Sequence, residues 1–234
     1  MPYFYAQDQT PIYYEETGEG PPLLLLHGNG ETHEIFQSLI SVLSPRFHVV
    51  AMDSRGHGRS GYGNQELSLP AMADDCAALV QHLEIDKLSV LGFSDGGNIA
   101  LYFALRYPEK LNCLVLIGAN LNPGAVKRST QIPIEIGYRL TSLFPTANGR
   151  KKRQILGLMI HWPQIRPEEL EYITAPTLVL AGERDLIKEE HTRMIAQKIP
   201  HAQLEIIPKA NHFVLGKQAA ETNRRIFTFL TRNL

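Results

Sequence analysis

The sequence predicts an α/β fold in which a mostly parallel sheet is flanked by helices. Short apolar runs alternate with amphipathic segments along the chain, which is the pattern of strand–helix–strand units. A glycine-framed serine, Ser94, stands between one such run and a helical pattern. With 234 residues, of which 44% are hydrophobic and 20% charged, the chain is expected to form one well-filled domain over residues 1–234.

Seven strands are expected where short apolar runs are bounded by turn residues. Their ranges are 12–16, 23–26, 48–52, 88–91, 114–117, 177–180 and 204–207. The run from Leu23 to Leu26 has helix-forming residues, but Pro21 and Pro22 before it and the glycines after it favour a buried strand.

Helices are expected between these strands, because apolar residues recur there at helical spacing. The expected segments are residues 35–43, 72–83, 97–107, 194–199 and 226–230. Cys76 falls on the apolar stripe of one helix and Cys113 in a predicted strand. Two cysteines are too few for a disulfide framework, so we expect two buried thiols.

The stretch from Leu121 to Thr174 breaks the alternation and is expected to form a cap. Five prolines interrupt it, helical pieces are indicated at residues 134–143 and 153–160, and its apolar content argues against disorder. Open α/β sheets bind ligands at the carboxyl ends of their strands, so an insertion after a strand shapes the pocket. The predicted pocket residues are Asp95, Leu143, Met159 and Trp162.

Charge and hydropathy exclude several kinds of partner. A net charge of -1 and a pI near 6.8 give no overall electrostatic attraction to nucleic acid or to an anionic membrane. The N-terminus has no signal-peptide pattern, and no segment approaches the roughly 20 apolar residues of a spanning helix. We therefore expect a cytoplasmic protein with a small-molecule substrate. The nine histidines lack the spacing of paired ligands, so neither a metal nor a cofactor is expected, and the oligomeric state has no signature in the sequence.

The sequence Gly92-Phe93-Ser94-Asp95-Gly96 has the form of a nucleophile elbow. A sharp turn from strand to helix presents a serine hydroxyl clear of the sheet edge, where a base can take its proton. Side chains in place of the two glycines would clash with neighbouring elements in so tight a turn. We therefore predict that Ser94 is a nucleophile.

Asp185 and His212 are the predicted partners of Ser94. Each follows one of the last two expected strands, so both can reach the edge of the sheet where Ser94 emerges. His212 would accept the Ser94 proton as general base, and Asp185 would orient the imidazole and stabilise its charged form. Glu183 is a rival acid, but Asp185 lies further beyond its strand. No acid follows the strand 114–117, so a triad acid there is excluded.

Acyl transfer also needs hydrogen-bond donors for the developing oxyanion. The loop His27-Gly28-Asn29-Gly30 follows an expected strand, and its glycines let the backbone approach a ligand. The predicted donors are the backbone N–H groups of Asn29 and Asp95. His27 is expected to brace this loop.

Two interpretations of the Asp95 side chain stay open. Its carboxylate can pair with a cationic group of a substrate, such as the amine of an amino-acid ester. Alternatively it points away and caps the start of the following helix, where aspartate is favoured.

Together these motifs resemble those of the α/β-hydrolase fold superfamily along essentially the whole chain. The matching pieces are the loop at His27, the elbow at Ser94 in an S-D-G-G variant, Asp185, His212 and the turn Asp53-Ser54-Arg55-Gly56-His57-Gly58-Arg59-Ser60. That turn is similar to the D-x-R-G-x-G-x-S turn of the family, which is mainly structural, so Arg55 and His57 are expected to be scaffold. The resemblance implies a twisted sheet of about eight strands with a small helical cap, residues 121–174, inserted after the sixth strand.

The resemblance also implies a serine hydrolase that cleaves a small, largely apolar acyl substrate through an acyl-enzyme on Ser94, with a carboxylic ester as the expected substrate. Hydrolysis of carbon–carbon bonds or small amides uses the same triad and stays open. Epoxide hydrolases and haloalkane dehalogenases of this fold have an aspartate nucleophile, and haloperoxidase-like members usually have an aromatic residue where Asn29 stands. The alternative from another class is a non-catalytic ligand receptor on a hydrolase scaffold.

Overall fold

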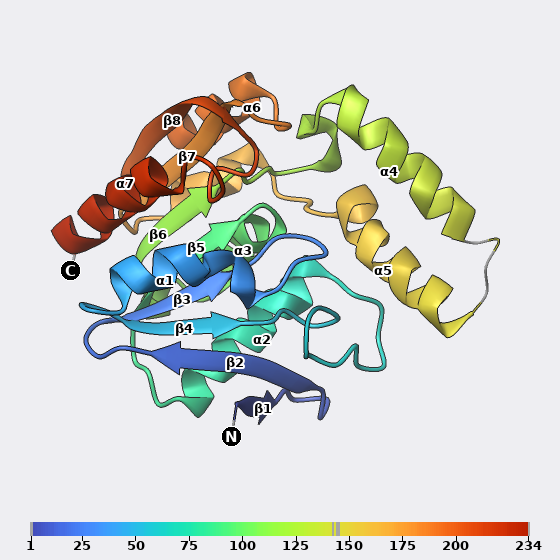
Figure 1. The fold of residues 1–234 in the computed structure, drawn as a ribbon, viewed down its shortest axis with the longest axis horizontal. Helices are drawn as coiled ribbons and strands as arrows, with labels where there is room; N and C mark the ends of the chain where they lie inside the picture. The colour runs from blue at the N-terminus through green and yellow to red at the C-terminus, as the bar shows by residue number, and fades with distance from the viewer. Residues whose placement is uncertain (1, 142, 144–145, 234) are drawn as a thin grey trace.

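The centre of the protein is a mostly parallel sheet with helices on both faces (Figure 1). The computed structural model describes residues 2–141, 143 and 146–233. The strand order is β1-β2-β4-β3-β5-β6-β7-β8. The strands are β1 Tyr3–Tyr5, β2 Pro11–Thr17, β3 Pro22–Leu26, β4 His48–Met52, β5 Leu88–Phe93, β6 Leu111–Ile117, β7 Thr177–Arg184 and β8 Ala202–Asn211.

The expected fold class is confirmed, with one additional strand. β1 pairs with β2, and β2 with β4, in antiparallel fashion, and the neighbouring strands from β4 across the sheet to β8 pair in parallel. The sequence did not indicate β1, because a run of three residues is too short to show the alternation that marks a strand.

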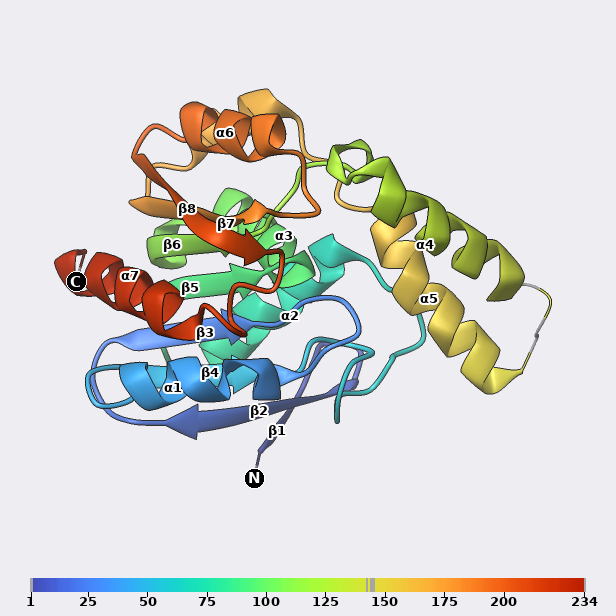
Figure 2. The same cartoon turned by 45° about the horizontal axis from the view of Figure 1, so that its top comes forward.

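The parallel strands β3 to β7 are buried on both faces over most of their length, which explains why they read as continuous apolar runs. Successive side chains point to opposite sides of a strand, so Leu23 and Leu25 of β3 join one core and Leu24 and Leu26 join the other. The helices α1 Gln37–Leu43 and α7 Ala219–Arg232 cover the first face, and α2 Leu69–His82, α3 Asp95–Arg106 and α6 Glu189–Lys198 cover the second (Figure 2). Short 3-10 turns are η1 His33–Phe36 and η2 Pro108–Lys110.

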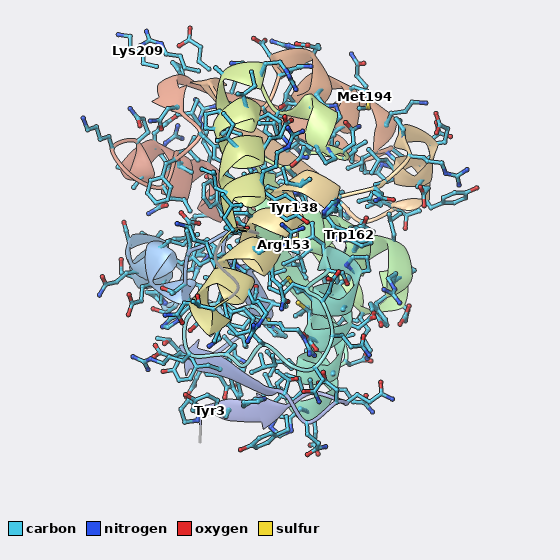
Figure 3. All side chains as sticks on the ribbon, turned by 90° about the vertical axis from the view of Figure 1, so that its right-hand side faces the viewer. Tyr3, Tyr138, Arg153, Trp162, Met194 and Lys209 are labelled. Carbon is cyan, nitrogen blue, oxygen red and sulfur yellow. The ribbon has the colours of Figure 1, made fainter. Side chains whose placement is uncertain are left out.

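The cap follows β6, the sixth strand, as expected. It is an antiparallel pair of helices, α4 Arg128–Thr141 and α5 Ala147–His161, between the turns η3 Pro123–Ala125 and η4 Pro167–Tyr172. Figure 3 shows Tyr138 and Arg153 side by side between the two helices, with the guanidinium 4.1 Å from the ring centre. Both helices begin earlier than expected, and Pro133 lies inside α4 rather than before it. Pro145 and position 142 of the expected helix lie outside the described residues.

Within the described ranges, no helix combines the length and the apolar character needed to cross a membrane. Cys76 and Cys113 are both buried free thiols, as predicted.

Candidate active site

The elbow at Ser94 has the backbone geometry that its glycines suggest. β5 is buried throughout and α3 begins at Asp95, so Ser94 occupies the turn between them with φ 55° and ψ -120°. This left-handed φ is strained for a residue with a side chain. A Cβ on Gly92 would lie 2.1 Å from the Gly96 carbonyl oxygen, and a Cβ on Gly96 would lie 2.0 Å from that of Leu26. Only glycine fits at either position.

Ser94, His212 and Asp185 form a continuous chain of hydrogen bonds at the carboxyl ends of β5, β7 and β8. The His212 Nε2 atom lies 3.0 Å from Ser94 Oγ, and its Nδ1 atom lies 2.7 Å from Asp185 Oδ1. A carboxylate only accepts, so Nδ1 carries the proton and Nε2 is left to accept the Ser94 hydroxyl proton. The structure thus brings the three predicted side chains together in the predicted order.

Asp185 is held rigidly in this chain. It is buried, and its Oδ1 atom also accepts the backbone N–H of Ile187 at 2.9 Å. Gly118, directly after β6, makes room for the pair: it has φ +61°, and a Cβ there would lie 2.7 Å from His212 Cε1. Gly118 follows the strand 114–117, after which the sequence has no acid, and a glycine just past a central strand is itself a signal for a close approach.

The rival acid, Glu183, faces elsewhere. β7 extends to Arg184, further than predicted, so Glu183 lies within the strand, exposed to solvent. Its carboxylate accepts the backbone N–H of Lys209 at 2.6 Å. Of the two acids, it is Asp185, one residue beyond the strand, that contacts His212.

The loop after β3 and the elbow each offer one free backbone donor near Ser94. In the part of the chain that the structure describes, the N–H groups of Asn29 and Asp95 have no hydrogen-bond acceptor. The amide nitrogen of the Asn29 side chain, in contrast, uses both of its hydrogens: Nδ2 donates to Asp95 Oδ2 and to the Ile155 carbonyl oxygen, both at 2.9 Å. Since Ile155 belongs to α5, this side chain joins the loop to the cap.

Both oxygens of the Asp95 carboxylate are engaged within the protein. Oδ2 accepts from Asn29 and Oδ1 accepts from Asn98 Nδ2 at 3.2 Å. Burial raises the pKa of this carboxyl, while the two amide donors lower it. The side chain therefore does not cap α3 through a backbone N–H, and the pairing of its carboxylate with a cationic substrate group stays a prediction.

Further polar residues near the elbow are not among those predicted from the sequence. Asn98 and Asn120 exchange two hydrogen bonds, of 3.0 and 2.8 Å, which tie α3 to the segment after β6. Asparagine on the buried face of a helix, four residues after the nucleophile, was the available signal. Glu31 accepts the backbone N–H of Gly28 at 3.0 Å, and burial raises its pKa.

The turn from Asp53 to Ser60 is largely scaffold, as expected. The Arg55 guanidinium pairs with Asp8 at 2.6 Å and with Asp75 at 2.7 Å. His27 braces the loop by accepting the backbone N–H of Ser54 at 2.9 Å through Nε2, and burial lowers its pKa to about 4.

A narrow cavity adjoins the elbow, and it differs from the pocket predicted. Its lining residues are His27, Gly28, Asn29, Ser54, His57, Leu69, Met72, Asp95, Ile99 and Leu158. Of the predicted pocket residues, Asp95 lines it. Leu143 follows α4 and is 68% exposed, and Trp162 packs edge-on against Tyr102. Leu158, the neighbour of Met159 on α5, faces the core and lines the cavity, so Met159 points in another direction. The prolines interrupt the apolar pattern of this stretch, so the sequence did not reveal which face of the helix is buried. A wider cavity lies within the cap beneath α4 and includes none of the triad residues.

Across residues 2–141, 143 and 146–233, no group of three histidine, cysteine or carboxylate side chains is placed to hold a metal ion.

Comparison with known proteins gives matches over most of the chain. The sequence model described as the alpha/beta hydrolase fold matches residues 21–139. A poly(3-hydroxyalkanoate) depolymerase of Ectopseudomonas oleovorans is 31% identical over 85% of this chain and 81% of its own length. The serine hydrolase BPHL of Homo sapiens is 28% identical over 96% of this chain and 84% of its own.

Two further comparisons bear on length and fold. Three uncharacterized mycobacterial proteins are 33% identical over 54% of this chain, but the match spans only 35% of their length. The crystal structure of the enol-lactonase from Burkholderia xenovorans LB400 superposes with a TM-score of 0.85 over 98% of this chain and 100% of that one, at 21% sequence identity. At that identity the likeness concerns the fold.

Proposed function

Since this chain belongs to the α/β-hydrolase fold family, we propose that it is a serine hydrolase that cleaves a small, largely apolar carboxylic ester through an acyl-enzyme on Ser94. The observation that carries the proposal is the unbroken chain from Ser94 Oγ through the His212 imidazole to the buried Asp185 carboxylate. The names of two relatives, a depolymerase and a serine hydrolase, support hydrolytic chemistry.

In the proposed cycle, Ser94 Oγ attacks the ester carbonyl carbon while its proton passes to His212 Nε2. Asp185 holds the imidazole through Nδ1 and stabilises its positive charge. The free N–H groups of Asn29 and Asp95 are the proposed donors to the oxyanion, and each such donor is worth about 10²-fold in rate or more. His212 then protonates the leaving alcohol, and water activated by His212 hydrolyses the acyl-enzyme.

The test is hydrolysis of p-nitrophenyl esters of increasing acyl length by the wild-type protein and by Ser94→Ala in parallel. We expect turnover by the wild type and a loss of at least about 10³-fold in the variant, because Ser94 forms the covalent bond. The dependence of kcat/KM on acyl length shows how long an acyl chain the pocket accepts.

Two other outcomes would contradict the ester proposal. Turnover of carbon–carbon or amide substrates without esterase activity would assign the same triad to a different reaction. Tight binding of an ester without any turnover would favour a ligand receptor.

A further inference from the structure

Glu31 holds the loop after β3 through both its side chain and its backbone. Its carboxylate Oε2 accepts the Gly28 backbone N–H at 3.0 Å, and its own backbone N–H donates to the Gly28 carbonyl oxygen at 3.2 Å. The first bond engages the peptide unit before the Gly28 Cα atom, and the second engages the peptide unit after it. A single residue therefore fixes the orientation of two consecutive peptide planes.

The second of these planes contains the Asn29 N–H, which is a proposed oxyanion donor. In a trans peptide unit the C=O and the N–H point in opposite directions. The Gly28 carbonyl oxygen accepts from Glu31 and, at 2.8 Å, from Nδ1 of His27. That ring nitrogen carries the proton because His27 Nε2 accepts the Ser54 backbone N–H. The Asn29 N–H must therefore point away from both Glu31 and His27.

The same loop lies against the nucleophile. A Cβ on Gly28 would lie 2.7 Å from Glu31 Oε2 and 3.0 Å from Ser94 Cβ. The carboxylate and the nucleophile thus border the same glycine. Since the Asn29 N–H has no acceptor among the residues that the structure describes, any rotation of the Gly28 planes acts on a free donor near Ser94.

The negative charge of the Glu31 carboxylate works against an oxyanion nearby, so its favourable contribution is the hydrogen bond. Burial raises the pKa of Glu31, the Gly28 N–H and the attraction of His212 lower it, and the charge of Asp95 raises it. An ionised acceptor makes a stronger hydrogen bond than a neutral one, which fixes the Gly28 N–H firmly. An amide oxygen in the same place would keep the bond without the charge.

We propose that Glu31 is a positioning residue for the oxyanion hole. Its bonds on both sides of Gly28 keep the Asn29 N–H directed at the oxygen that becomes negative when Ser94 attacks. Glu31 acts through Asn29 and makes no contact of its own with the reacting atoms. This inference rests on the proposed acyl-enzyme function and deepens it.

The test uses two ketones that differ only in their fluorine atoms. With butyl trifluoromethyl ketone, Ser94 Oγ adds to the carbonyl carbon, its proton passes to His212 Nε2, and the carbonyl oxygen becomes an oxyanion. Butyl methyl ketone has the same carbon skeleton but binds without forming this adduct. Ligand-observed NMR measures both dissociation constants without requiring turnover, and kcat/KM is measured for p-nitrophenyl butanoate.

The proteins are the wild type, Glu31→Ala, Glu31→Gln and the control Glu34→Ala, which removes an exposed carboxylate from the adjoining turn η1. We expect Glu31→Ala to lower kcat/KM about 10-fold and to weaken binding of the trifluoromethyl ketone by a similar factor, with binding of the methyl ketone unchanged. Glu31→Gln should recover most of both losses, because its amide oxygen can accept the Gly28 N–H. Glu34→Ala should match the wild type.

Three results would overturn the inference. Glu31→Ala could keep the wild-type preference for the trifluoromethyl ketone, or it could weaken both ketones equally, which would indicate a general change in the site. An equal loss in Glu31→Gln and Glu31→Ala would assign the effect to charge rather than to the hydrogen bond. Absence of ester turnover by a wild type that still forms the ketone adduct would contradict the proposed function alone, whereas absence of the adduct would contradict both.

Discussion

The sheet core and the α4–α5 cap of this protein differ in how completely their side chains are buried. Every residue of β5 is buried, and nine residues of α3 are buried with it. In α4 the only buried residues are Gln131 and Thr141, both polar, while Ile132 and Ile136 are 42% and 53% exposed. The groups that must keep fixed distances therefore stand on the ends of core strands, and the cap reaches the site through few contacts.

Those few contacts are specific. Asn29 Nδ2 donates to the Ile155 carbonyl oxygen, and Gln154 Oε1 accepts the Leu67 backbone N–H at 3.2 Å. Leu158 is the one buried apolar side chain of α5. The comparison predicts that changes in the core strand ends alter catalysis strongly, whereas changes in the cap act weakly or through Asn29.

The largest effect is expected from Gly118→Ala. The new Cβ would lie 2.7 Å from His212 Cε1, at a φ of +61° that alanine adopts only with strain. Displacing the His212 ring should lower kcat/KM by at least about 10²-fold, since catalytic groups tolerate little misplacement. Steady-state kinetics of a plain ester checks this. Wild-type kcat/KM in a folded variant would show that the Gly118 contact does not hold the triad.

A core histidine should make stability depend on pH. Burial lowers the pKa of His27 to about 4 from the unfolded value of 6.5, so the folded state keeps His27 neutral while the unfolded chain takes up a proton. This stability is present above pH 6.5 and is lost as the pH falls to about 4, by roughly 3 kcal/mol in all.

Urea unfolding of wild type and His27→Gln at several pH values measures this loss. The variant should show a shallower decline between pH 6.5 and 4, whereas His161→Gln on the exposed end of α5 should retain the wild-type slope. Equal slopes for wild type and His27→Gln would argue that other groups carry the acid sensitivity.

The hydrogen bond that links the core to the cap is tested by Asn29→Ala. The change keeps the backbone N–H that is the proposed oxyanion donor, but it removes the hydrogen bonds to Asp95 and Ile155. We expect kcat/KM to fall about 10-fold, because the loop loses the side chain that orients it. Gln154→Ala, which removes a contact between cap and core away from this loop, is the control. If both variants lose activity equally, the effect comes from the cap in general.

The smallest effect is expected within the cap, from Gly137→Ala. A Cβ there would meet Leu156 Cδ1 at 3.6 Å, an ordinary contact, and alanine favours a helix over glycine by about 0.5–1 kcal/mol. Slower amide hydrogen exchange in α4 with unchanged kcat/KM is the expected result. Faster exchange would show that α4 depends on glycine at this position.

The same contrast explains which features the sequence revealed. Continuous apolar strands, the glycines at Ser94 and the positions of Asp185 and His212 after strands follow from local patterns, and the structure brings these residues together. Contacts between distant segments left no local pattern. The Asn29 bridge to Ile155 spans 126 positions, and the choice of Leu158 over Met159 depends on the rotation of α5 against the core.

The central claim is that Ser94 forms a covalent acyl intermediate. Rapid mixing of the protein with excess p-nitrophenyl butanoate, acid quenching and mass analysis of the peptides tests it most directly. The account predicts a butanoyl group on the peptide that carries Ser94, formed within the burst of p-nitrophenol release and absent in Ser94→Ala. Ester turnover with the acyl group on another residue, or turnover that persists in Ser94→Ala, would contradict it.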